Sequence, residues 1–183
     1  MALNLADLNQ QTRQFMLEEI ERDIAQGELY LSSYFNETGK TAYPELLREA
    51  ARSHDDQWLA NSLRRNGCFA ATTTRRKPKG GYTEAKVPVT APETCAEGEF
   101  NRFYARALCR LAIEAGIPSL QIYRAKAVAV PRPDSEAKIG SMIDANALLQ
   151  DLRTHRMDTA LGLPPGPNSG LSVRLPATAA ARA

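Results

Sequence analysis

TAPETCAEGEFNRFYARALCRLAIEAGIPSLQIYRAKAVAV, residues 90–130, carries both the clearest helix pattern and the clearest strand pattern in the chain. Between 100 and 115 the apolar residues recur at the i, i+3, i+4, i+7 spacing of one helix face. Gly116 and Pro118 then end the helix. Residues 120–130 are rich in strand-forming types. We therefore expect an α+β fold in which a long central helix packs on a small β-sheet.

The predicted strand over 120–130 has two different faces. One face carries Leu120 and Ile122 but also the charged Arg124 and Lys126, whereas the other carries a row of alanines at 125, 127 and 129. Small side chains let a helix approach closely, so we expect the alanine face to receive the central helix.

The segments before this unit predict a helix-rich N-terminal half. Periodic apolar residues indicate a helix over 9–26, and a helical hairpin follows whose arms start at Pro44 and at Asp55 or Asp56. Residues 28–33 have the composition of a short strand, and residues 36–40 that of a turn. Beyond the central unit, Asp144 is placed to cap another helix.

These patterns divide the chain into three parts. We expect a helical region over 1–67, an α+β core over 68–161, and an extended C-terminal arm over 162–183. In the arm, six of the nine residues between 162 and 170 are glycine or proline, and strict alternation follows over 171–175. Leu171, Val173 and Leu175 need a surface to bury against, so we expect this lone strand to form a subunit interface by adding to a neighbouring sheet.

Composition excludes several classes of protein. The 183 residues include 43% hydrophobic and 24% charged residues, and the net charge of +2 gives no global attraction to nucleic acid or membranes. The three cysteines and two histidines form no metal-binding or disulfide pattern, so we expect no metal and no cofactor. Apolar runs fall short of the ~20 residues that a membrane span needs, so we expect no membrane partner.

The strongest local charge lies in and before the predicted basic hairpin over 75–86, whose turn is built on Pro78, Gly80 and Gly81. Between 64 and 86 there are seven basic residues and one acid, Glu84. Arg64 and Arg65 precede the hairpin. The candidate contacts to phosphate or to an acidic partner are Arg75, Arg76, Lys77, Lys79 and Lys86. A solvated hairpin tip is the alternative that needs no ligand.

The central helix carries a row of arginines with i, i+4 spacing: Arg102, Arg106 and Arg110. Such a row is typical of a solvated or interfacial helix face, because the planar guanidinium group suits protein interfaces. We assign it to a subunit interface.

Three phrases in the chain resemble poorly characterised proteins of tailed bacteriophages. They are EGEFNRFYARALC over 97–109, YRAKAVAVPRPDSE over 123–136 and GPNSGLSVRL over 166–175. Together with the hairpin, the arginine row and the C-terminal arm, this resemblance implies a non-enzymatic assembly subunit, either capsid-associated or connecting head and tail. Its partners would then be copies of itself and other phage structural proteins. Its location would be the virion, assembled in the host cytoplasm.

Two other functions stay open. A nucleic-acid-binding accessory protein would use the basic hairpin and the arginine row of 102, 106 and 110 for non-specific contacts to phosphate. An enzyme of an unrecognised type would need a cleft that brings together Tyr104, Arg124, Glu136 and Lys138. No pattern in the sequence identifies a catalytic residue, so we favour the non-enzymatic interpretations.

Overall fold

The computed structural model describes residues 2–77, 80–155, 159–163 and 169–177. Three helices come first and a β-hairpin follows, and the remaining helices and strands form an α+β protein. In sequence order the elements are α1 (Gln10–Ala25), α2 (Glu37–Ser53), α3 (Asp56–Arg65), β1 (Thr72–Arg76), β2 (Tyr82–Lys86), α4 (Ala91–Glu114), β3 (Ser119–Arg124), α5 (Pro133–Lys138), β4 (Met142–Asp144), α6 (Ala145–Thr154) and β5 (Leu171–Arg174).

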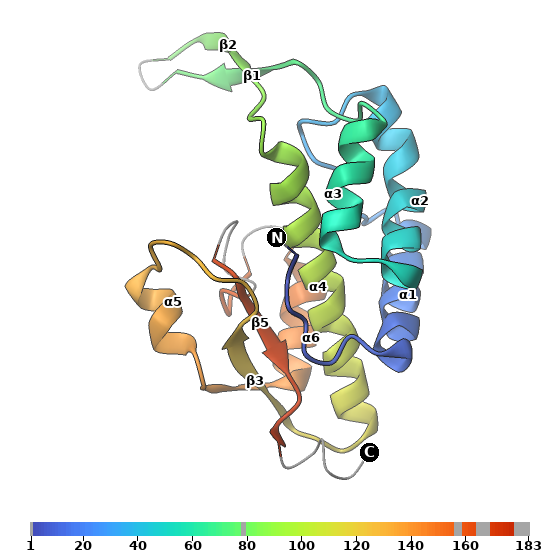
Figure 1. The fold of residues 1–183 in the computed structure, drawn as a ribbon, viewed down its shortest axis with the longest axis vertical. Helices are drawn as coiled ribbons and strands as arrows, with labels where there is room; N and C mark the ends of the chain where they lie inside the picture. Colours follow the sequence, from blue (N-terminus) through green and yellow to red (C-terminus); the bar gives the residue numbers. More distant parts are fainter. Residues whose placement is uncertain (1, 78–79, 156–158, 164–168, 178–183) are drawn as a thin grey trace.

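Helix α4 lies at the centre of the molecule, between helices α1 to α3 on one side and a three-stranded sheet on the other (Figure 1). Its buried residues occupy its whole circumference, among them the apolar Phe100 and Leu108 and the charged Arg106. A helix that is buried all round belongs to the core and not to the surface. The predicted long central helix packed on a small sheet is confirmed.

The sheet has the order β4–β3–β5, and both pairings are antiparallel. Leu120 and Ile122 of β3 point into the core and are buried. The prediction that the alanine face receives the helix is wrong, because β3 ends at Arg124 and both Ala127 and Ala129 are exposed. Larger aliphatic side chains bury more apolar surface than alanine, and this favours the observed orientation.

Helix α2 begins earlier than its sequence indicates. The Oδ1 atom of Asn36 accepts a hydrogen bond from the backbone N–H of Gly39 at 2.8 Å, which caps the helix start. The expected turn over 36–40 is therefore the first part of the helix, and Pro44 lies inside it. The cap satisfies a backbone group that a turn would have left to solvent.

Residues 28–33, which were predicted to be a strand, form none. The nearest pairing is an isolated antiparallel bridge between Phe35 and Phe69, whose rings meet edge to face with centroids 5.0 Å apart. No strand of the described residues lies beside 28–33 to complete a hydrogen-bonded ladder. Strand propensity alone does not form a strand when the backbone groups have no partner.

The expected C-terminal arm returns to its own chain. Strand β5 pairs with β3, and its side chains Leu171 and Val173 are buried in the core. The backbone N–H of Leu175 donates to Asp7 Oδ2 at 2.9 Å. Assigning these three residues to a subunit interface is therefore wrong. The edge of β3 beside the core offers both hydrogen-bonding groups and an apolar surface, so the alternating strand buries there. Residues 164–168 of the connector lie outside the described residues.

Candidate nucleic-acid interface

Strands β1 and β2 form an antiparallel hairpin that projects from the end of the molecule where α3 leads into α4 (Figure 1). Arg76 lies opposite Tyr82 at the outer end of the ladder. The backbone N–H of Lys77 donates to the carbonyl of Gly81 at 2.9 Å and continues the pairing toward the turn. Gly80 and Gly81 have φ values of 87° and 80°, which only glycine adopts without strain. The predicted hairpin is present.

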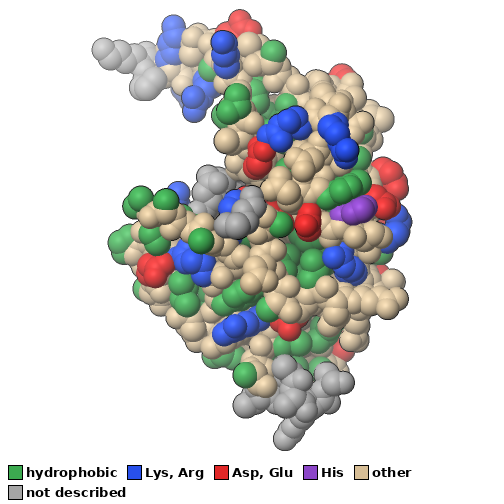
Figure 2. Space-filling model, in the orientation of Figure 1, with side chains coloured by type: hydrophobic (Ala, Val, Ile, Leu, Met, Phe, Trp, Pro, Cys, Tyr) green, Lys and Arg blue, Asp and Glu red, His purple; other side chains and the backbone are tan. Residues whose placement is uncertain are grey.

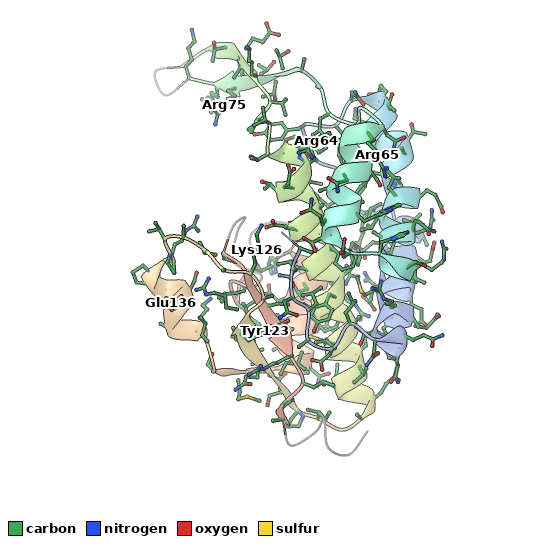
Figure 3. The ribbon with its side chains drawn as sticks, viewed as in Figure 1. Arg64, Arg65, Arg75, Tyr123, Lys126 and Glu136 are labelled. Carbon is green, nitrogen blue, oxygen red and sulfur yellow. The ribbon has the colours of Figure 1, made fainter. Side chains whose placement is uncertain are left out.

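Basic side chains extend from both faces of the hairpin. Because cross-strand partners share a face, Arg75 lies on the same face as Thr73 and Ala85, whereas Arg76 and Lys86 lie on the other. Thr73 and Ala85 are the half-buried positions of the two strands, so their face looks toward the body. Figure 3 shows Arg75 on this inner side of the hairpin.

The basic side chains of the hairpin have no partner among the described residues. Arg75, Arg76, Lys77 and Lys86 are exposed, and their side chains make neither a hydrogen bond nor an ion pair there. Lys79, the fifth predicted contact residue, lies outside the described residues. Basic side chains elsewhere are commonly engaged; Arg52, for example, pairs with Glu49 at 2.6 Å. The positive charge of the hairpin is therefore available to a ligand.

Two more arginines lie at the base of the hairpin, in the last turn of α3. Arg64 forms an ion pair with Glu93, and the Nη2 atom of Arg65 donates to Ser62 Oγ at 3.1 Å. In Figure 3, Arg64 lies between α3 and α4, and Arg65 lies on the side of α3 toward α2. Figure 2 shows basic groups on the hairpin and on the neighbouring part of the body, with hydrophobic groups between the two sets. The basic surface thus includes the hairpin and the end of α3.

The arginines of the α4 row bind groups within their own chain. The side chain of Arg106 is 0% exposed, and its Nη1 and Nη2 atoms donate to the two carboxylate oxygens of Asp23 at 2.6 and 2.8 Å. Its Nε donates to Glu19 Oε2 at 2.9 Å. Burial lowers the pKa of Arg106, but the hydrogen bonds and charges of Asp23 and Glu19 outweigh it and raise the pKa overall.

The neighbours of Arg106 in the row also bind within the chain. The Nη2 atom of the buried Arg102 donates to the backbone carbonyl of Leu152 at 2.5 Å. Arg110 pairs with Glu18 at 2.7 Å. Assigning the row to a subunit interface is therefore wrong, because it joins α4 to α1 and α6. The sequence does contain a signal for this pairing. On α1, Glu19 and Asp23 have the same i, i+4 spacing as the arginines of α4.

The residues required by the enzyme hypothesis do not converge. Arg124 contacts Glu136, but Lys138 Nζ donates to the backbone carbonyls of Leu161 and Gly162, both at 3.1 Å. Tyr104 is buried elsewhere, and its hydroxyl accepts a hydrogen bond from the backbone N–H of Asp7 at 3.1 Å. These contacts hold loops and helices together. They do not assemble an acid, a base and a binding group at one point.

Other titratable side chains have structural neighbours. His54 stacks on Trp58 with ring centroids 4.3 Å apart, and His155 Nδ1 lies 2.8 Å from Asp151 Oδ1. Burial raises the pKa values of Cys95 and Cys109, so both thiols stay protonated near neutral pH. In the described part of the chain, no group of histidine, cysteine and acidic side chains is arranged to hold a metal ion.

Comparison with known proteins assigns no family to the chain. No family model, no curated protein and no solved structure matches it. Within the described residues, no helix combines the length and apolarity that crossing a membrane requires. The functional interpretation therefore depends on the geometry of the basic hairpin.

Proposed function

We propose that the protein binds nucleic acid, using the basic hairpin to contact backbone phosphates. The observation that carries this proposal is that Arg75, Arg76, Lys77 and Lys86 are all exposed and lack acidic partners among the described residues. Lysine and arginine side chains of this kind neutralise phosphates and release condensed counterions, which gives binding independent of base sequence.

Folding does not account for the composition of this hairpin. A two-stranded ribbon is only marginally stable by itself, and this one places no residue of β1 or β2 in the buried core. Clustering cations on it adds repulsion between like charges. A polyanionic ligand removes that repulsion and gives the projecting cations a partner.

The proposal is tested by comparing two double variants with the same charge change. Arg75→Gln with Arg76→Gln removes two hairpin cations, and Lys40→Gln with Arg52→Gln removes two cations of α2 that already have acidic partners. Anisotropy of a labelled duplex is measured at a series of salt concentrations. Four phosphate contacts in the intact protein predict a slope of about −3 to −4 in log affinity against log salt.

The hairpin variant should bind every sequence more weakly and lose about 2 units of that slope, whereas the α2 variant should match the intact protein. Equal effects of the two variants would indicate a general charge effect and would contradict a hairpin site. Absence of binding to duplex, single strand and heparin at low salt would reject nucleic-acid binding altogether.

The assembly-subunit hypothesis stays a prediction. The arginine row and the β5 strand are engaged within the chain, so the projecting hairpin is the feature that still supports it. A hairpin of this shape can also reach an acidic surface on a neighbouring protein. Native mass in solution, with analysis of purified particles for the protein, tests this hypothesis independently of nucleic acid.

A further inference from the structure

Building on the proposed nucleic-acid binding, on which it rests, we infer that the ligand is a single strand whose bases lie on the outer face of the β1–β2 ribbon. The outer face is the one turned away from the body. It consists of strand residues alone, and all of its side chains are exposed: Thr72, Thr74, Arg76, Tyr82, Glu84 and Lys86.

The aromatic ring on this face indicates contact with bases and not only with phosphates. Tyr82 is 72% exposed, whereas every other phenylalanine, tyrosine and tryptophan of the chain is buried or half-buried. Within the described residues its ring stacks on no other ring, and its hydroxyl makes no hydrogen bond. Stacking on exposed aromatic rings is how proteins hold unpaired bases. In a duplex the faces of each base are covered by its neighbours, so the ring selects a single strand.

Two cations share the face with the ring. Arg76 is the direct cross-strand partner of Tyr82, and Lys86 lies four residues further along β2. Four strand residues span about 13 Å, so the two cations can reach different phosphates of the strand whose base stacks on the ring. Neither cation has an acidic partner among the described residues. The face therefore combines a stacking surface with two phosphate contacts.

The acid of the face distinguishes it from a surface that binds phosphates alone. Glu84 lies between Tyr82 and Lys86 on β2, and Arg76 is its diagonal neighbour on β1. Its carboxylate nevertheless makes no ion pair and no hydrogen bond with the described residues. A carboxylate repels phosphate but accepts a hydrogen bond from the exocyclic amino group of cytosine. Beside the ring, it favours a base that carries an amino group over thymine or uracil, which have none.

The inner face of the ribbon lacks these groups. In β1 and β2, both fully described, it carries Arg75 with Thr73, Thr83 and Ala85, and it has neither an aromatic ring nor an acid (Figure 3). Arg75 can contact a phosphate, but this face gives a base nothing to stack on. A duplex would use the cations of both faces and leave the ring and the carboxylate without partners, so the composition of the outer face favours a single strand.

The experiment measures the affinity of the full chain for labelled oligo-dC, oligo-rC, oligo-dT and a mixed-sequence DNA duplex of the same length. The pH is slightly alkaline, so that cytosine is unprotonated. Oligo-dC or oligo-rC should bind at least about 10-fold more tightly than the duplex and several-fold more tightly than oligo-dT. The tighter of the two oligo-C probes identifies the sugar of the preferred strand.

Stacking is tested by removing the ring without changing the charge. Tyr82→Ala should weaken binding of oligo-C by about 10-fold and leave the salt slope unchanged, whereas Tyr82→Phe should bind like the intact protein. Thr83→Ala changes the next residue, on the inner face, and is the matched control that should have no effect. Arg76→Gln should lower the slope by about 0.7. Unchanged affinity of Tyr82→Ala for single strands would overturn the stacking contact.

The role of the acid is tested by the ratio of two affinities. Glu84→Ala should strengthen binding of oligo-dT, because repulsion is removed, and bring the affinities for oligo-dC and oligo-dT to about the same value. Equal strengthening of both, with the preference for oligo-dC retained, would overturn the base contact of Glu84.

Two further outcomes separate this inference from the proposed function. Equal affinity for duplex and single strands, with the salt dependence of the hairpin cations intact, would overturn the single-strand preference and leave nucleic-acid binding in place. If no probe binds at low salt, the proposed function fails together with this inference.

Discussion

Two sets of arginines in this protein have opposite surroundings. Arg106 of α4 is fully buried and bound by two carboxylates of α1, whereas Arg75 and Arg76 of the hairpin are exposed and have no partner in the described residues. In sequence both sets are simply clusters of positive charge. The difference shows that a cluster of arginines indicates a binding surface only where the fold brings no acidic side chains close enough to form ion pairs with it.

The comparison also separates two energetic roles. A buried charge strongly destabilises the fold if its partners are removed, because burial penalises an unpaired ion. An exposed, unpaired charge contributes little to stability. Removing it should therefore change ligand affinity and not the free energy of unfolding. The following changes test this division, from the largest expected effect on stability to the smallest.

Arg106→Ala should cost about 3–5 kcal/mol of unfolding free energy, since it removes the buried guanidinium that donates two hydrogen bonds to Asp23 and one to Glu19. Urea unfolding followed by circular dichroism measures the loss. Arg76→Ala, which removes an exposed arginine, is the control and should stay within about 0.5 kcal/mol. If both substitutions cost the same, the contrast between the two sets is wrong.

Leu171→Ala should cost about 2–5 kcal/mol, because the side chain is buried and its strand pairs with β3 of the same chain. This change distinguishes an internal strand from one that joins subunits. Thermal unfolding and native mass are measured on the same sample. A variant that keeps its stability but changes its oligomeric state would contradict the internal assignment.

Glu99 tests the acidic side of the buried network. Burial raises its pKa from 4.5 to about 7, with the charges of Arg102 and Arg106 opposing the shift. Between these two values the folded state holds a proton that the unfolded chain has lost, so stability falls as pH rises from 4.5 to 7. Above pH 7 the full penalty is present, on the order of 3 kcal/mol.

Glu99→Gln should therefore stabilise the protein at pH 8 and leave it nearly unchanged at pH 4. The measurement is the difference in unfolding free energy between the variant and the intact protein at both pH values. The difference isolates Glu99 because the other titrating groups are the same in both proteins. A destabilising effect at pH 8 would mean that Glu99 is ionised and paired.

Arg75→Gln, Arg76→Gln and Lys86→Gln should each change stability by less than about 0.5 kcal/mol, since the side chains are exposed and unpaired within the described structure. Removing repulsion between like charges makes a slight gain the expected direction. Their effect should appear only in binding to polyanions. A loss of stability comparable to that of Arg106→Ala would show that the hairpin is a folding element.

Local sequence chemistry predicted helices α1, α3, α4 and α6, although it placed the start of α2 too late. The apolar period over 100–115 predicted α4, and the caps at Asp55 and Asp144 predicted the starts of α3 and α6. The glycines at 80 and 81 predicted the hairpin turn. These signals are short-range, because they depend on periodicity and on hydrogen bonds between residues a few positions apart.

The candidate site itself was predictable, because the hairpin cations are close together in sequence and, within the described residues, no distant acid pairs with them. Tertiary structure decided the rest. The pairing of β5 with β3 brings together Gln121 and Arg174, which are 53 positions apart, and the buried network brings together Asp23 and Arg106, which are 83 positions apart. No local pattern specifies such partners. An arginine row or an alternating strand has the same sequence whether its partner is water, another subunit or a distant part of its own chain, and only the packed fold selects among them.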